Sequence, residues 1–432
     1  MIKLIIAYDN NHTSAMNFFF LLHMQKIPDR LAFSKWFRIS LLNLLIVACL
    51  GVILRYKIAF SLPFIDQKFF LNAHSHFAFA GWISQALITF ITAKINKYSQ
   101  NFSSKKYRYL LIANLITAYG MLLSFPFEGY GLISIIFSTL SIFSSYAFTI
   151  VVWRDLNRLP FKAVSHKWFK AALIFNVISS FGAFGLAYMM ANHIAHPNWY
   201  LASVYFFLHF QYNGWFFFAC MGLLTSELGT TLISEKLQHT VFGLFAFACI
   251  PAYFLSALWL PIPVWVYVLV VIAAFVQLIG WIILLNKIIR HRTKIFSGMN
   301  SGVKYLLCLA AIALSIKLLL QLGSTIPALS TWAFGIRPIV IGYLHLILLG
   351  VITLFLIAYA IKEQYISFNK KTIYSLAIFI GGIILTELLL MIQGLGAIKY
   401  KAVPYVNELL FTAACIMLIG IGILYVSNRR TM

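Results

Sequence analysis

The sequence predicts an all-α, polytopic membrane protein with about twelve transmembrane helices. Hydrophobic residues make up 62% of the 432 residues and charged residues only 10%, and the mean hydropathy is +0.90. Such a composition lies outside the range of water-soluble domains. Apolar runs of about 17–25 residues, long enough to cross a bilayer, occur twelve times. Helices are expected because a backbone in lipid must satisfy its own hydrogen bonds.

The apolar runs fill most of the chain. We expect a cytoplasmic N-terminal segment at 1–37, a transmembrane domain at 38–426 and a cytoplasmic tail at 427–432. Part of the N-terminal segment, with Phe18–Leu22 followed by Lys26 and Arg30, suits a position along the inner membrane surface. The predicted spans lie roughly at 38–55, 69–93, 107–125, 131–152, 168–191, 200–224, 240–258, 263–285, 303–322, 338–361, 373–393 and 404–426.

The basic residues indicate orientation rather than a nucleic-acid partner. The formal net charge is +23, but most Lys and Arg fall in alternate connections, which the positive-inside rule assigns to the cytoplasm together with both termini. The charge then faces anionic lipid, and no basic fold that could bind nucleic acid is predicted. The expected location is the bacterial inner membrane.

Three histidines recur in the second, sixth and tenth predicted spans, each followed five residues later by glycine. Histidine is costly within a bilayer, and the intervals are nearly equal, which predicts three pseudo-repeated arcs of four helices. Each histidine lies roughly 10–14 Å below the outer edge of its span, at ~1.5 Å per residue. The three pairs are His76 and Gly81, His209 and Gly214, and His345 and Gly350.

Other polar residues share this outer layer. Lys317 is expected to pair with Glu387 or Glu408, because an ionisable group in lipid needs a partner. His74 and His76 point about 200° apart on a helix, so they cannot face the same neighbour, and either remains a candidate ligand. The alternative interpretation of every such histidine is a hydrogen bond that holds two helices together.

This pattern resembles the catalytic subunit of haem-copper oxidases and nitric oxide reductases. The segment Asn72-Ala73-His74 is similar to that family's Ala-His segment, which ligates the low-spin haem in the second span. His345 matches the haem-ligating histidine of the tenth span, and His209 with Tyr212 falls where the family places its first copper ligand.

The chain also departs from this family. The seventh span, 240–258, lacks the family's His-His pair, and Tyr343 stands where the second haem's ligand is expected. The sequence His74-Ser75-His76 resembles the His-Ala-His pattern of NnrS-like membrane proteins, which are haem and copper proteins tied to nitric oxide stress.

The resemblance implies a haem protein, with haem of b type and with copper left open. Axial ligands would be His345 and either His74 or His76, His209 would stand at a second metal or gas site, and Arg337 would meet a haem propionate. The implied activity is electron transfer, or binding or reduction of nitric oxide or oxygen, which would make the chain an oxidoreductase. Implied partners are a cytochrome or quinol donor, a diatomic gas, lipid and further subunits.

A twelve-helix secondary transporter with a histidine-lined polar site is the alternative function. Transporters also carry polar residues near the middle of the membrane. Broken helices and an inverted repeat would favour this alternative, whereas histidine spans that all run in one direction favour the haem protein.

Overall fold

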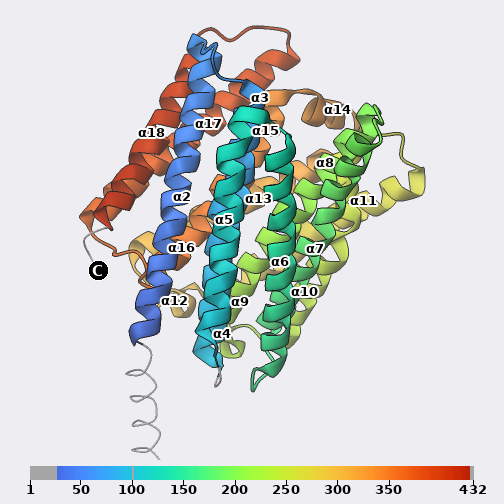
Figure 1. Cartoon of the computed structure of the whole chain (residues 1–432). Coiled ribbons are helices and arrows are strands. Elements are labelled where there is room, and N and C mark those ends of the chain that lie inside the picture. Colours follow the sequence, from blue (N-terminus) through green and yellow to red (C-terminus); the bar gives the residue numbers. More distant parts are fainter. Residues whose placement is uncertain (1–26, 100–101, 429–432) are drawn as a thin grey trace, which may run out of the picture.

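The computed structural model describes residues 27–99 and 102–428 and is entirely helical over these ranges. This confirms the all-α prediction. Figure 1 shows a bundle of long helices. The elements are α2 Ile27–Phe60, α3 Gln67–Phe77, η1 Ala78–Ser84, α4 Gln85–Tyr98, α5 Ser104–Glu128, α6 Leu132–Arg158, α7 Val164–Ala191, α8 Pro197–His209, η2 Phe210–Phe216, α9 Phe217–Leu232, α10 Glu235–Cys249, η3 Pro251–Ala257, α11 Val264–Arg290, α12 Arg292–Ile295, α13 Ser301–Gly323, α14 Pro327–Gly335, α15 Arg337–His345, η4 Leu346–Thr353, α16 Leu354–Lys362, α17 Lys370–Ile398 and α18 Val406–Ser427.

Ten helices in the described ranges are long and apolar enough to cross a membrane, or eleven if one bent pair counts as a span. The bent pair is α10 with η3, which meet at 45°. Residues 197–232, which hold the sixth predicted span, form the consecutive helices α8, η2 and α9 but are not among the ten. Their Tyr, Trp, Gln and Asn side chains lower the hydropathy of this segment.

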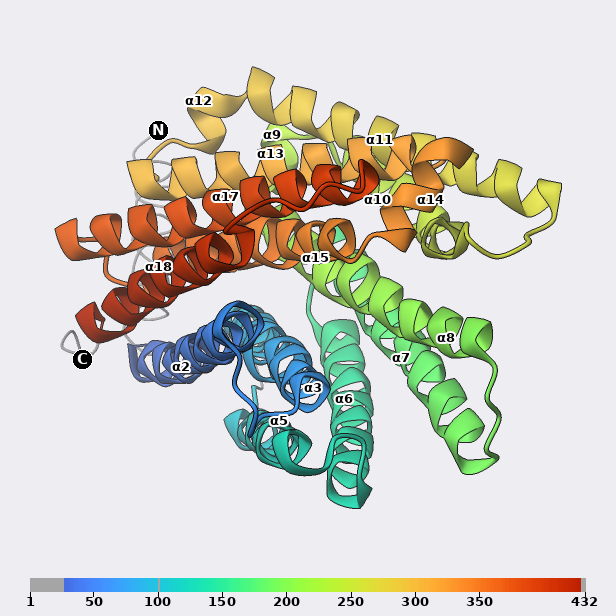
Figure 2. The ribbon, with the colours of Figure 1, turned by 90° about the horizontal axis from the view of Figure 1, so that it is seen from above.

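The first and last helices lie side by side. Helix α18 packs against both α17 and α2, and the views in Figure 1 and Figure 2 show α2 beside α18. Helix α2 begins at Ile27, so the end of the predicted N-terminal segment forms its first turns. The interfacial helix predicted around Phe18 lies outside the described residues.

Each of the three His-x4-Gly patterns marks the start of a π-helical segment. The π-helices η1, η2 and η4 begin one or two residues after His76, His209 and His345, and each contains the glycine of its pattern. A π-turn forms hydrogen bonds between residues five apart and is commonly found at functional sites. The weak sequence pattern thus corresponds to a specific backbone feature in all three places.

Glycine is required where η2 meets α7. A Cβ atom on Gly214 would lie only 2.5 Å from the Cβ atom of Phe175, a distance that real side chains do not tolerate.

In η1, backbone carbonyls accept hydrogen bonds from asparagine side chains. Asn43 Nδ2 donates to Gly81 O over 2.6 Å, and Asn114 Nδ2 donates to Ala80 O over 3.0 Å.

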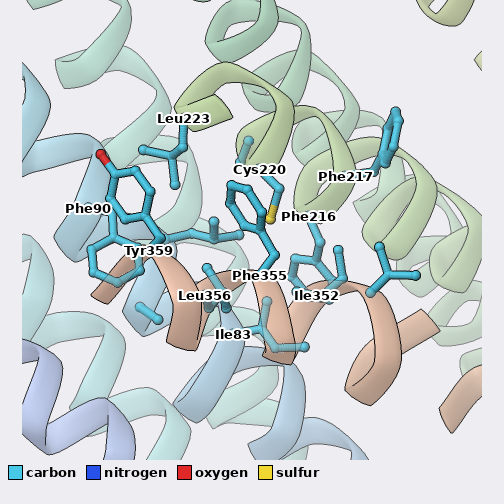
Figure 3. Packing of buried hydrophobic residues seen from close by; sticks show 14 of the residues in the cluster. Ile83, Phe90, Phe216, Phe217, Cys220, Leu223, Ile352, Phe355, Leu356 and Tyr359 are labelled. Carbon is cyan, nitrogen blue, oxygen red and sulfur yellow. The ribbon is translucent and has the colours of Figure 1, made fainter. Parts of the chain in front are cut away.

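Three runs of consecutive helices carry the three histidines: α3-η1-α4, α8-η2-α9 and α15-η4-α16. These histidine-bearing paths meet through tightly packed apolar side chains. Phe90 of α4 contacts Tyr359 of α16, with ring centroids 4.9 Å apart, and Phe79 of η1 contacts Phe216 of η2 at 5.2 Å. Figure 3 shows this packing, with Ile83, Ile352 and Leu356 on one side and Leu223 and Cys220 facing them. We call these closely packed apolar side chains between η1, η2, α4 and α16 the solid core.

Candidate functional site

Helix α3 presents His74 to helix α2. The Nδ1 atom of His74 lies 3.1 Å from the backbone carbonyl oxygen of Val47. A carbonyl can only accept, so Nδ1 carries the proton and Nε2 keeps its lone pair. Gly51, one turn further along α2, lies beside the ring, where a Cβ atom would be in ordinary van der Waals contact with His74 Cε1 at 3.4 Å. A backbone carbonyl on one ring nitrogen is the usual way in which proteins orient a metal-binding imidazole.

Helix α15 places His345 near His74. The two imidazoles interact electrostatically although 271 residues separate them in the chain. The Nδ1 atom of His345 is buried and has no hydrogen-bond partner among the described residues. Both side chains are half-buried rather than fully packed. The structure thus brings together one histidine from the second span and one from the tenth.

Two arginines accompany this histidine pair. Arg55 of α2 interacts electrostatically with His74, with His345 and with Arg337 at the start of α15. Arg55 is half-buried and Arg337 is exposed, and neither forms an ion pair with a carboxylate in the described ranges. Like charges repel each other, so this end of the site favours an anion. Arg337 was predicted from the sequence, whereas Arg55 was not, because it is one of several basic residues at span ends.

His76 faces a different neighbour. Its Nε2 atom lies 3.0 Å from the hydroxyl oxygen of Tyr130, and its ring stacks on Phe125 with centroids 4.6 Å apart. Burial raises the pKa of Tyr130 to about 12, so the phenol keeps its proton at neutral pH, and its hydroxyl group can either donate a hydrogen bond to Nε2 or accept one from it. His76 therefore lies on the side of α3 that contacts α5, away from the pair formed by His74 and His345.

Both ring nitrogens of His209 are bonded within the protein. Asn213 Nδ2 donates to His209 Nδ1 over 3.1 Å, which leaves Nε2–H to donate to the carbonyl oxygen of Cys249 over 2.8 Å. The side chain is only 1% exposed. A metal ion could bind His209 only after one of these hydrogen bonds breaks. Within the described ranges, no group of three or more His, Cys, Asp or Glu side chains could hold a metal ion.

Lys317 does not form the predicted ion pair. The described ion pairs include none between Lys317 and Glu387 or Glu408. Glu387 instead lies beside helix α15, where a Cβ atom on Gly342 would be 3.6 Å from its Oε2 atom, and its Oε1 atom has no partner there. The pairing hypothesis therefore fails in this arrangement, because the side chains point to different neighbours.

One group of paired charged residues lies at the far ends of the histidine-bearing paths. Glu227 of α9 bonds to both Lys94 of α4 and Lys362 of α16. Glu363 lies 4.0 Å from Lys94 and 3.3 Å from Lys362. We call Lys94, Glu227, Lys362 and Glu363 the charge cluster. It connects the three histidine-bearing paths and was not predicted from the sequence.

No model of a known protein family matches the chain, and no curated protein matches it significantly.

The residues around His74 and His345 suit a bis-histidine haem site. Two imidazoles from separate helices, one with its Nε2 lone pair free, can serve as axial ligands. The two arginines can meet the propionates of a haem by charge-assisted hydrogen bonds. The sequence analysis left His74 and His76 as alternatives, and this arrangement favours His74.

Proposed function

We propose that this chain is a haem-binding integral membrane protein with His74 and His345 as the axial ligands. The proposal rests on two half-buried imidazoles with nitrogens available to a ligand: His345 Nδ1 has no partner among the described residues, and the bond of His74 Nδ1 to Val47 O leaves His74 Nε2 unprotonated. Arg55 influences the charge of both imidazoles. Haem of b type needs only such non-covalent ligation, and when bound it supplies a one-electron redox couple.

The protein's own groups have distinct roles in this proposal. The Val47 carbonyl fixes the tautomer and orientation of His74. Arg55 and Arg337 hold an anionic edge of the ligand towards the outer end of the bundle. The solid core next to the π-helices excludes water from the other side, which strengthens electrostatic interactions within the site.

The proposed activity is electron transfer, or binding or reduction of a diatomic gas such as nitric oxide, with a cytochrome or quinol as donor. Electron transfer is favoured over gas chemistry. If both imidazoles held the haem iron, no position would remain for a gas, and the bonded nitrogens of His209 do not offer a copper ligand. The proposed architecture remains that of the haem-copper oxidase superfamily: twelve spans in three arcs, both termini inside. The three π-helices at corresponding places support this repeat.

An optical spectrum tests the proposal. Protein purified in detergent from haem-supplied cells should show a Soret band and, after reduction, sharp α and β bands typical of six-coordinate haem. His74→Ala and His345→Ala should each abolish this six-coordinate spectrum. His76→Ala is the matched control, because it removes a histidine two residues away on the same helix and should leave the spectrum unchanged. Protein without any Soret band, or a full spectrum in His345→Ala, would refute haem ligation by this pair.

One observation favours the alternative of a secondary transporter. The bend of 45° between α10 and η3 is the kind of helix break that such proteins use to bind substrates. Reconstituted protein that accumulates a solute in vesicles, with no haem bound, would support the transporter and contradict the haem protein.

A further inference from the structure

A small cavity lies between five helical segments, η2, α9, α10, α11 and α13. Its volume is about 10 Å³, which is close to the space that one water molecule needs. All of its lining side chains are at least nine-tenths buried. They are Asn213, Phe217, Phe218, Phe245, Gln277, Lys317 and Leu318.

Two polar side chains reach this cavity without a protein partner. Lys317 is 6% exposed and has neither a hydrogen bond nor an ion pair in the described part of the chain. Gln277 is 4% exposed, and its Oε1 atom has no donor there. Buried polar groups almost always have a partner, which is either protein or ordered water.

The chemistry of these groups identifies the ligand. Gln277 Oε1 requires a donor, whereas the amine of Lys317 supplies protons and requires an acceptor. A halide ion could accept from Lys317 but could not donate to Gln277. A metal cation would be repelled by the lysine. Water both donates and accepts, and it matches the volume of the cavity.

We propose that this cavity is a water site built into the membrane domain. One water molecule accepts a hydrogen bond from Lys317 Nζ and donates one to Gln277 Oε1, with Asn213 as a further polar neighbour. The water links α13, α11 and η2 across the bundle. Because Asn213 also donates to His209 Nδ1, the water helps to fix the side chain that sets the tautomer of this histidine. The site does not depend on haem binding.

A double-mutant cycle tests the bridge. Lys317→Met, Gln277→Leu and the double variant would be compared by their melting temperatures in detergent. Each single change leaves the other polar group unpaired, so the double variant should lose clearly less than the sum of the two single losses. Strictly additive losses would overturn the proposal.

Thr386→Val provides the matched control. Thr386 is 2% exposed and its Oγ1 atom also lacks a partner, but it lies on α17 and does not line the cavity. Its effect should add to that of Lys317→Met. Coupling of equal size in this control would show a general response of the bundle and would count against the bridge.

Two measurements distinguish water from an anion and do not require the variants to fold. A high-resolution structure of the unaltered protein should show one solvent peak within hydrogen-bond distance of both Lys317 Nζ and Gln277 Oε1. Replacing gluconate by bromide at constant ionic strength should leave the melting temperature unchanged. Saturable stabilisation by bromide, or density that lacks the peak, would overturn the assignment to water.

Discussion

The indole nitrogen of Trp82 donates a hydrogen bond to the hydroxyl oxygen of Thr353 over 2.9 Å, and both side chains are fully buried. Trp82 belongs to η1 and Thr353 ends η4, so this bond joins two of the three π-helical segments directly. A second indole makes a similar link, because Trp215 Nε1 of η2 donates to Ser84 Oγ of η1 over 3.1 Å. Side-chain bonds thus connect the π-helices across the solid core.

Trp82→Phe should lower the free energy of unfolding by about 2 kcal/mol, because the buried Thr353 hydroxyl loses its donor. Thr353→Val should have a similar effect by leaving the indole N–H unpaired. Unfolding in mixed micelles would measure both. The double variant should lose less than the sum, and simple additivity would show that the bond contributes little.

The glycines of the three patterns should differ in their tolerance of alanine. Gly214→Ala places a methyl group 2.5 Å from Phe175 Cβ, which cannot move without its backbone, so we expect a loss of about 3 kcal/mol. Gly350→Ala meets Ala313 Cβ at 3.1 Å and Leu346 Cδ1 at 3.6 Å, and a small shift should limit the loss to about 1 kcal/mol. Unfolding in mixed micelles would measure the loss in each variant. Equal losses at the two sites would contradict this reading of the packing.

Glu227→Gln should strongly destabilise the charge cluster. The change keeps the shape of the side chain but leaves Lys94, which is 5% exposed, without its main partner. Removing one member of a buried pair typically costs about 3 kcal/mol. Lys106→Met is the control, because it breaks the more exposed pair with Asp155, which should contribute about 1 kcal/mol or less. A loss at Glu227 no larger than at Lys106 would mean that solvent screens the cluster.

The sequence predicted the helical fold well, because twenty-residue apolar runs leave few alternatives in lipid. The shared depth of the three histidines stays a prediction, since depth in a membrane was inferred only from position along each helix. The sequence did not predict which neighbouring helix a side chain faces. His74 and His76 differ in their neighbours only through the packing of α3 against α2 and α5, and no periodicity in a single span encodes that packing.

Residues that distant helices bring to the site were not predicted, for the same reason. Arg55 is one basic residue among several at span ends, and only the approach of α15 to α2 distinguishes it. Lys317 shows the opposite error. A lysine and a glutamate at one depth looked like a pair, but the structure turns Lys317 towards Gln277 and the cavity and Glu387 towards Gly342.

Arg55→Gln should weaken haem retention more than Arg337→Gln if the two arginines bind propionates. Arg55 is half-buried beside both histidines, whereas Arg337 is exposed and its charge is screened by water. A charge-assisted hydrogen bond lost from a half-buried site corresponds to about tenfold weaker binding, and we expect roughly threefold or less for Arg337. Haem transfer to excess apomyoglobin, followed by the Soret band, would measure both.

The positions of the reduced α and β bands should stay unchanged in both variants, because the axial ligands are intact. Arg55→Gln protein that holds haem as tightly as the unaltered protein would remove this arginine from the site, while loss of the six-coordinate spectrum would mean that Arg55 positions His74 or His345 instead.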